Sequence, residues 1–218
     1  NVEYAPFSSI ESLIDTLNSK LHSKGIIIWA YTINDLPCHP RYSALYREYV
    51  YVEPEEYYTN TNLNDLNNYT KLFIGLHDFK YLSLRDKTEV LTVRKIDDIR
   101  VYRENGFIVF RFLAKSFTRG LVRMIVTCVK LLACGIISQN DVERLLSGIP
   151  VAHVRKLLKP APAHNLVLYN IVYPFSFKLL YDYWECVIMY LSRHQSIPVF
   201  KYLYRYLSSD STKVLSLL

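Results

Sequence analysis

An apolar run between Leu121 and Ile137 constrains the fold more than any other part of this 218-residue chain. Arg123 and Lys130 interrupt the run and Gly135 weakens it, so a buried helix is favoured over a membrane span. A guanidinium stays ionised at any useful pH, and its burial is costly unless an anion meets it. Arg123 therefore predicts a carboxylate or phosphate facing it.

The composition predicts a folded chain with a sizeable core, because half of the residues are hydrophobic and 14% are aromatic. The net charge of +6 is compatible with a polyanionic partner such as a nucleic acid, but a charge of this size does not require one. The four cysteines form no C-x-x-C pair and no ordered Cys/His cluster. We therefore expect no metal site and a reducing, intracellular setting.

The order of the patterned segments predicts an α+β fold, with an antiparallel sheet and helices packed on one face. The expected helices cover residues 9–23, 63–74 and 117–134, a short segment capped by Ser138 or Asn140 and ending at Leu146, and residues 175–207 with a break at Pro198. The expected strands cover residues 26–31, 43–53, 90–104, 107–113 and 166–173. Residues 75–79 are expected to form a turn, and Asn105-Gly106 predicts a hairpin between two of the strands.

The strand over residues 43–53 is a candidate ligand-binding element. Alternate residues of a strand share a face, so Arg47, Tyr49 and Tyr51 would line one side. Tyrosine rings offer flat faces on which a base can stack, and arginines hold phosphates. An ordinary strand is the alternative, because tyrosine is a good strand former and the chain has 19 of them.

A second candidate is the basic series Lys115, Arg119 and Arg123, which repeats every four residues and would form one ridge on a helix. Lys115 and Arg119 lie near the expected helix start, where free N–H groups also favour a phosphate. A solvated basic edge explains Lys115 and Arg119 equally well but suits Arg123 poorly. A third segment, from Lys159 to Leu168, by itself indicates only an ordered turn leading into a strand.

Taken in order, these blocks resemble the TruA family of tRNA pseudouridine synthases. Each block is weak alone, but four in the right order are specific. They are Arg41-Tyr42-Ser43-Ala44 with Arg47-Glu48-Tyr49-Val50-Tyr51; Gly75-Leu76-His77-Asp78-Phe79; Ser116-Phe117 with Val122-Arg123-Met124-Ile125-Val126; and Ala161-Pro162-Ala163-His164-Asn165-Leu166-Val167-Leu168. The chain departs from the family pattern at Asn165, where the family usually has glycine.

The resemblance implies a pseudouridine synthase-like fold that isomerises uridine to pseudouridine in the anticodon stem-loop of tRNA, without a cofactor. It implies that Tyr49 stacks on the flipped uracil and that Leu166 packs on the base. It also implies that Arg123 pairs with a catalytic aspartate and keeps it ionised. The remaining basic site residues are then expected to bind the tRNA: Arg41, Arg47, Lys115 and Arg119.

The family carries its catalytic aspartate in a Gly-Arg-Thr-Asp loop, which occurs nowhere in this chain. Asn1-Val2-Glu3-Tyr4 resembles the segment that follows that loop. We therefore expect an N-terminal part with the catalytic aspartate to be absent from the sequence, and the chain alone to be inactive. Residues 1–80 would be the remainder of a first half, residues 90–174 a second α+β half, and residues 175–218 a helical extension.

The resemblance further implies a cytoplasmic homodimer with no membrane partner. Two alternatives stay open at this point. One is a non-catalytic RNA-binding module with the same fold. The other is a protein-interaction module whose aromatic residues between positions 175 and 207 form the interface.

Overall fold

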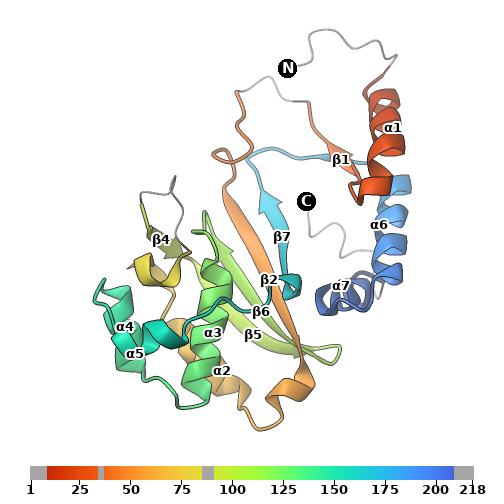
Figure 1. Cartoon of the computed structure of the whole chain (residues 1–218). Helices are drawn as coiled ribbons and strands as arrows, with labels where there is room; N and C mark the ends of the chain where they lie inside the picture. The colour runs from red at the N-terminus through yellow and green to blue at the C-terminus, as the bar shows by residue number, and fades with distance from the viewer. Residues whose placement is uncertain (1–8, 34–36, 85–90, 209–218) are drawn as a thin grey trace.

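The computed structural model describes residues 9–33, 37–84 and 91–208 (Figure 1). Residues 1–4, which carry part of the family resemblance, lie outside these ranges, as does residue 90, where the second expected half begins. The first helix, α1 (Ile10–Leu21), begins where the Ser9 side chain accepts a hydrogen bond from the Ser12 N–H. A short 3-10 turn, η1 (His22–Lys24), and Gly25 end it, so the helix expected over residues 9–23 is confirmed.

The main sheet contains four antiparallel strands in the order β5-β6-β2-β7. They are β2 (Tyr46–Pro54), β5 (Asp98–Glu104), β6 (Phe107–Ala114) and β7 (Leu166–Val172). Asn105 and Gly106 join β5 to β6 with φ angles of 53° and 81°. Two residues with positive φ match the right-handed twist of a tight hairpin, so the hairpin expected at Asn-Gly is confirmed.

One face of the main sheet forms the larger core with four helices. These are α2 (Leu63–Lys71), α3 (Leu121–Ala133), α4 (Gln139–Leu146) and α5 (Ala152–Leu157). Tyr51, Phe110 and Phe112 point from the sheet into this core and are fully buried. The apolar run of the sequence thus forms the buried helix α3, which starts four residues later than expected.

The other face of the main sheet is also covered by helices. Val50, Val52 and Val109 point to this side and pack with residues of α7 (Pro198–Ser208) and with Leu191 of α6 (Tyr181–Arg193). The α+β class with an antiparallel sheet is confirmed, but the helices lie on both faces rather than one. Side chains of a strand alternate between its two faces, and β2 and β6 carry apolar residues on both. Helices therefore cover both faces of the sheet.

Two small sheets flank the main one. In the first, β3 (Gly75–Asp78) pairs with β4 (Val93–Ile96), so the turn expected at residues 75–79 is wrong. In the second, β1 (Ala30–Tyr31) pairs with β8 (Lys178–Leu179), which lies inside the region expected to be wholly helical. The strand expected over residues 26–31 is short because the backbone N–H and C=O of Ile28 both bond to the Asn18 side chain instead.

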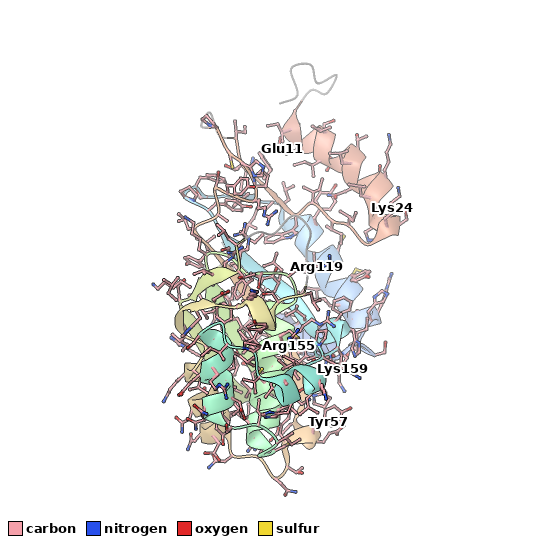
Figure 2. All side chains as sticks on the ribbon, turned by 60° about the vertical axis from the view of Figure 1, so that its left-hand side comes forward. Glu11, Lys24, Tyr57, Arg119, Arg155 and Lys159 are labelled. Carbon is pink, nitrogen blue, oxygen red and sulfur yellow. The ribbon has the colours of Figure 1, made fainter. Side chains whose placement is uncertain are left out.

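Three further 3-10 turns complete the described chain: η2 (Glu55–Tyr58), η3 (Lys80–Leu82) and η4 (Ala163–Asn165). Glu11 of α1 and Tyr57 of η2 lie at opposite ends of the molecule (Figure 2). Over the ranges given above, the longest and most apolar helices fall short of what a membrane crossing needs.

Candidate active site

Strand β2 carries the first candidate residues on one face, as the alternation of the sequence predicts. Arg47, Tyr49 and Tyr51 pair across to Ala114, Phe112 and Phe110 of β6, and cross-strand partners point to the same side. Tyr51 lies in the core, whereas Arg47 and Tyr49 are only half-buried. The start of β2 therefore offers a basic and an aromatic side chain at the margin of the larger core.

A cavity of roughly 380 Å³ opens at this margin, where β2 begins and β6 ends. Its walls are basic and aromatic, which suits a phosphate-bearing ligand with a flat ring. Four of the predicted site residues, Arg41, Arg47, Tyr49 and Lys115, come together in it. The complete lining is Arg41, Tyr42, Ala44, Arg47, Tyr49, Arg94, Lys115, Ser116 and Phe117.

Arg47 holds the walls of this cavity together. Its Nη1 donates to the carbonyl of Lys115 at 2.6 Å, and its Nη2 donates to the carbonyl of Arg41 at 2.5 Å. One guanidinium thus joins the segment before β2 to the segment after β6, although Arg47 and Lys115 are 68 residues apart in sequence. Because both bonds end on backbone carbonyls, Arg47 positions the backbone of Arg41 and of Lys115, whatever ligand is bound.

Tyr49 is the aromatic floor of the cavity. The ring of Phe117 meets it edge to face, with centroids 5.0 Å apart and an interplanar angle of 83°. Burial raises the pKa of the Tyr49 hydroxyl, and the charge of Arg47 partly opposes this rise. The phenol is therefore neutral at neutral pH. The sequence pattern does not single out Phe117 as a site residue; its place beside Ser116 in the third family-like block is the only signal.

The expected ridge of Lys115, Arg119 and Arg123 does not form, because α3 starts only at Leu121. Gly120 precedes it with a φ of 77°, and a Cβ at this position would lie 2.8 Å from Leu84. The chain therefore forms a turn at Arg119 and Gly120, and the helix begins only after it. Lys115 reaches the cavity from the end of β6, whereas Arg119 is exposed on the surface and is not among the lining residues (Figure 2).

Arg123 lies on the half-buried strip of α3, together with Thr127 and Lys130 at helical spacing. Its Nε donates to the carbonyl of Ala161, and the Ala161 N–H donates back to the carbonyl of Arg123 at 3.2 Å. Within residues 9–33, 37–84 and 91–208, no carboxylate forms an ion pair with this guanidinium. The anion that the sequence predicts for Arg123 stays a prediction.

A buried polar spot adjoins Arg123. Burial, and then the charge of Glu53, raise the pKa of the Tyr51 phenol, whereas Asn165 and Arg123 act in the opposite direction. Asn165 is 5% exposed, and its Oδ1 is buried with no hydrogen-bond partner in the described part of the chain. Asn165 ends the short turn η4, and it does not use the left-handed conformation that replacement of a glycine suggests.

Strand β7 brings the last predicted residue, Leu166, opposite Tyr51, where it packs on the larger core. Leu168 stands opposite Tyr49 and is 40% exposed. A β-bulge shifts the pairing between Glu48 and Tyr49. Leu168 is thus closer than Leu166 to the position that a ring stacked on Tyr49 would occupy, and the sequence alone does not distinguish the two leucines.

Comparisons with known proteins agree with the family resemblance of the sequence. Residues 70–174 match a family model described as tRNA pseudouridine synthase. A relative named tRNA pseudouridine synthase A from Thermococcus kodakarensis is 30% identical over 149 residues, which are 67% of this chain and 53% of the relative. Its namesake from Pyrococcus horikoshii is 33% identical over 159 residues, 72% of this chain and 56% of the relative. The namesake from Methanosarcina barkeri is 29% identical over 157 residues, covering 72% and 55%.

The chain spans about half the length of the curated relatives it matches. The matched family region contains β6, α3 and β7 and so includes Lys115, Phe117, Arg123 and Leu166. These are residues that the sequence blocks and the cavity geometry bring to the candidate site. Residues 70–174 thus match the tRNA pseudouridine synthase family, and the chain is similar to proteins named tRNA pseudouridine synthase A.

Proposed function

We propose that the protein is a tRNA pseudouridine synthase, which isomerises uridine to pseudouridine in the anticodon stem-loop of tRNA without a cofactor. One observation carries the proposal. Two sequence blocks that resemble the family, residues 41–51 and 116–126, converge on a single basic and aromatic cavity around Tyr49. The family match supports the same activity from the sequence side.

The uracil would bind in this cavity after leaving the stacked helix, because its reacting atoms are out of reach inside a stem-loop. Its ring would lie on Tyr49, with Leu168 or Leu166 of β7 on the adjoining side. Stacking of a base on an aromatic side chain contributes about 1–3 kcal/mol. Phe117 limits the tilt of the Tyr49 ring by its edge-on contact and so preserves the stacking surface.

The cations around the cavity would hold the backbone of the RNA. Arg41 and Lys115 are exposed at its rim, and Arg47 anchors both of their backbones. Arg119 is exposed farther along the surface and would add a phosphate contact outside the cavity. Neutralised phosphates release counterions, so binding should weaken steeply as salt increases.

Arg123 would hold the catalytic aspartate that begins the detachment of uracil from its ribose. The carbonyl of Ala161 fixes the guanidinium at Nε, which leaves the Nη donors for a carboxylate. The positive charge would keep that carboxylate ionised, and the two-point contact would orient it. Asn165 and Tyr51 lie at the same spot and make it polar enough for a charged pair.

A non-catalytic RNA-binding module is the second candidate. It is favoured by the absence of a carboxylate facing Arg123 among the residues that the structure describes. Such a module would bind RNA through the cavity and its cations but would not form pseudouridine. A cytoplasmic location and a homodimer follow from the family resemblance and belong to the proposal; size-exclusion chromatography with light scattering tests the dimer.

The deciding experiment uses the protein as its gene encodes it. Binding of unmodified tRNA would be titrated by filter binding across a range of salt concentrations, and pseudouridine would be measured by mass spectrometry of digested tRNA. Salt-dependent binding with pseudouridine formation supports the enzyme. Binding without turnover supports the module, and an absence of salt-dependent binding contradicts both.

A further inference from the structure

Tyr42 is a large aromatic residue that the fold leaves in solvent at the rim of the cavity around Tyr49. It lines that cavity and is 72% exposed, whereas Tyr49 on the cavity floor is half-buried. A single exposed tyrosine needs no explanation by itself. Tyr42 is distinguished by the hydrogen bonds that fix its backbone in this exposed position.

The turn that carries Tyr42 is held from within. The N–H groups of Tyr42 and Ser43 both donate to the carbonyl of His39, at 3.0 and 2.9 Å. The N–H of His39 donates to Ser43 Oγ at 3.0 Å, and the N–H of Arg41 donates to Nδ1 of His39 at 3.1 Å. The next residue, Ala44, is buried in the core, so the turn is anchored at its end.

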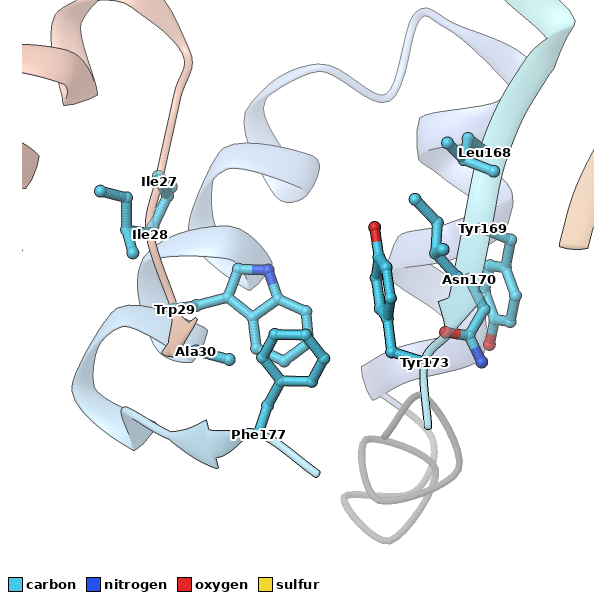
Figure 3. Close-up of a pocket in the computed structure, with 10 residues that line it drawn as sticks. Ile27, Ile28, Trp29, Ala30, Leu168, Tyr169, Asn170, Tyr173 and Phe177 are labelled. Atoms are coloured by element: carbon cyan, nitrogen blue, oxygen red, sulfur yellow. The ribbon is translucent and has the colours of Figure 1, made fainter. Parts of the chain in front are cut away.

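Two side chains from other parts of the fold hold the same turn from outside. Tyr173, which follows β7 and stands beside a second cavity (Figure 3), donates its hydroxyl to the carbonyl of Pro40 at 2.7 Å. Arg47 of β2 donates to the carbonyl of Arg41. The position of Tyr42 is therefore set before a ligand binds, so a contact with its ring costs little conformational entropy.

His39 packs against the Tyr42 ring. The two ring centroids are 4.5 Å apart, and the ring planes are inclined by 39°. Because Nδ1 of His39 accepts the N–H of Arg41, the imidazole cannot turn away from Tyr42 without losing that bond. The pair thus forms a rigid aromatic surface at the cavity rim, which suits a flat ring that has lost its own stacking partner.

The charges around Tyr42 indicate that this ring belongs to a nucleotide. Arg41 and Lys115 line the same cavity and can hold the phosphate that accompanies a base. The second cavity, of roughly 330 Å³ between residues 27–30 and β7, has an aromatic lining too, but none of its lining residues is charged (Figure 3). Aromatic rings and cations therefore coincide at Tyr42 and do not coincide at the second cavity.

We propose that Tyr42, backed by His39, stacks on the base that flanks the target uridine in the RNA. This role rests on the proposed function, which supplies the flipped uridine. When the uracil leaves the helix for the cavity at Tyr49, each flanking base loses a stacking partner, and this loss is costly. The Tyr42 ring replaces that partner on one side.

The contact gives the protein a preference among RNA sites. A purine offers a larger face than a pyrimidine, so stacking on Tyr42 favours a uridine that is flanked by a purine. Tyr42 touches the neighbour of the reacting nucleotide and takes no part in bond breaking. It is a specificity-determining residue, and its effect belongs to binding.

The test measures binding by the protein as its gene encodes it. Synthetic anticodon stem-loops carry a single loop uridine, flanked on each side in turn by adenosine, cytidine or an abasic site, and fluorescence anisotropy gives their affinities. With adenosine flanks, Tyr42→Ala should weaken binding about tenfold, the worth of one stacked base. Tyr42→Phe keeps the ring and should bind within about twofold of the original.

The abasic stem-loops separate stacking from other losses. When the contacted flanking base is missing, Tyr42→Ala should no longer weaken binding, and the side on which this happens identifies that base. Tyr57→Ala is the matched control, because Tyr57 is 66% exposed at the far end of the molecule and should leave every affinity unchanged.

The proposal is overturned if Tyr42→Ala weakens binding equally with adenosine and with abasic flanks on both sides, or if Tyr42→Phe binds as weakly as Tyr42→Ala. Salt-dependent binding that ignores the flanking base contradicts this inference alone. Flank-dependent binding without pseudouridine formation supports it and contradicts the enzyme. An absence of salt-dependent RNA binding contradicts the proposed function, and this inference with it.

Discussion

The ring of Phe117 meets the ring of Tyr49 edge to face, with the two centroids 5.0 Å apart. Phe117 comes from the segment that leads into α3, and Tyr49 comes from β2, so the contact joins two parts of the fold that form the candidate site. The hydroxyl of Tyr49 has no hydrogen bond in the described structure. We therefore expect the ring of Tyr49, rather than its hydroxyl, to contact a bound base.

For this reason Tyr49→Phe should keep turnover within a few-fold of the original, whereas Tyr49→Ala should lower kcat/KM by about 10- to 100-fold, the worth of one stacked base. Pseudouridine formation in tRNA, followed by mass spectrometry, provides the measurement. Equal activity of the two variants would argue against a stacking platform. Tyr57→Ala serves as a control for loss of an exposed tyrosine.

Arg123→Ala should lower kcat by roughly 100-fold or more, the order of effect that follows when a catalytic group is misplaced by about 1 Å. The affinity for tRNA should change only a few-fold, because Arg123 does not line the basic cavity. Arg123→Lys should not restore turnover, since an ammonium cannot bond to Ala161 and orient a carboxylate in the planar two-point way. Near-normal pseudouridine formation by Arg123→Ala would refute the assigned role.

Lys130→Met should lower the free energy of unfolding by about 3 kcal/mol, because it leaves a buried carboxylate without its cation. Lys130 Nζ lies 2.8 and 3.0 Å from the two carboxylate oxygens of Glu53, which is 3% exposed and also accepts a hydrogen bond from Tyr58. Denaturant unfolding measures the loss. Adding Glu53→Gln to Lys130→Met should recover part of it, and a double variant as unstable as the sum of the single ones would contradict the pairing.

Glu11 predicts a pH dependence at the junction of α1 with the β1–β8 sheet. Hydrogen bonds from Tyr31 first, and then from Lys178, lower the pKa of its carboxyl from 4.5 to about 2. A lowered pKa means that the stabilising contribution is complete above pH 4.5 and is lost as the pH falls through about 2. A ¹³C NMR titration of the Glu11 carboxyl should give this midpoint, and Lys178→Met should move it back toward 4.5.

Much of the fold follows from local patterns in the sequence. The Asn105-Gly106 hairpin, the helix from Leu121 and the strand that carries Tyr49 all have strong periodicity or turn signals, and all are present. Lys115 and Arg119 do not form a helical ridge with Arg123, because α3 begins only after Gly120. Gly120 has a left-handed conformation and lies against Leu84. Local pattern predicts a turn rather than a strand at residues 75–78, because the strand forms by pairing with β4, its partner in the described part of the chain, which lies in a separate segment of the sequence.

The candidate site was predictable where residue type and alternation suffice, as for Arg47 and Tyr49. It was not predictable where tertiary pairing decides. The bonds of Arg47 to two distant carbonyls, the edge-on approach of Phe117 and the position of Leu168 opposite Tyr49 all depend on which strands become neighbours. Hydrophobic periodicity specifies a face but not the partner strand.

The β-bulge between Glu48 and Tyr49 has a consequence for how this site tolerates change. It inserts one unpaired residue of β7 between the partners of these two positions, so the two halves of β7 keep separate registers against β2. Removing that residue would join the two registers into one regular ladder, with Leu168 still opposite Tyr49 and Asn170 still opposite Glu48. Deletion of Tyr169 should therefore leave Leu168 at the ligand-facing position, whereas deletion of Leu168 should bring Tyr169 there, in both cases without unravelling the rest of the sheet.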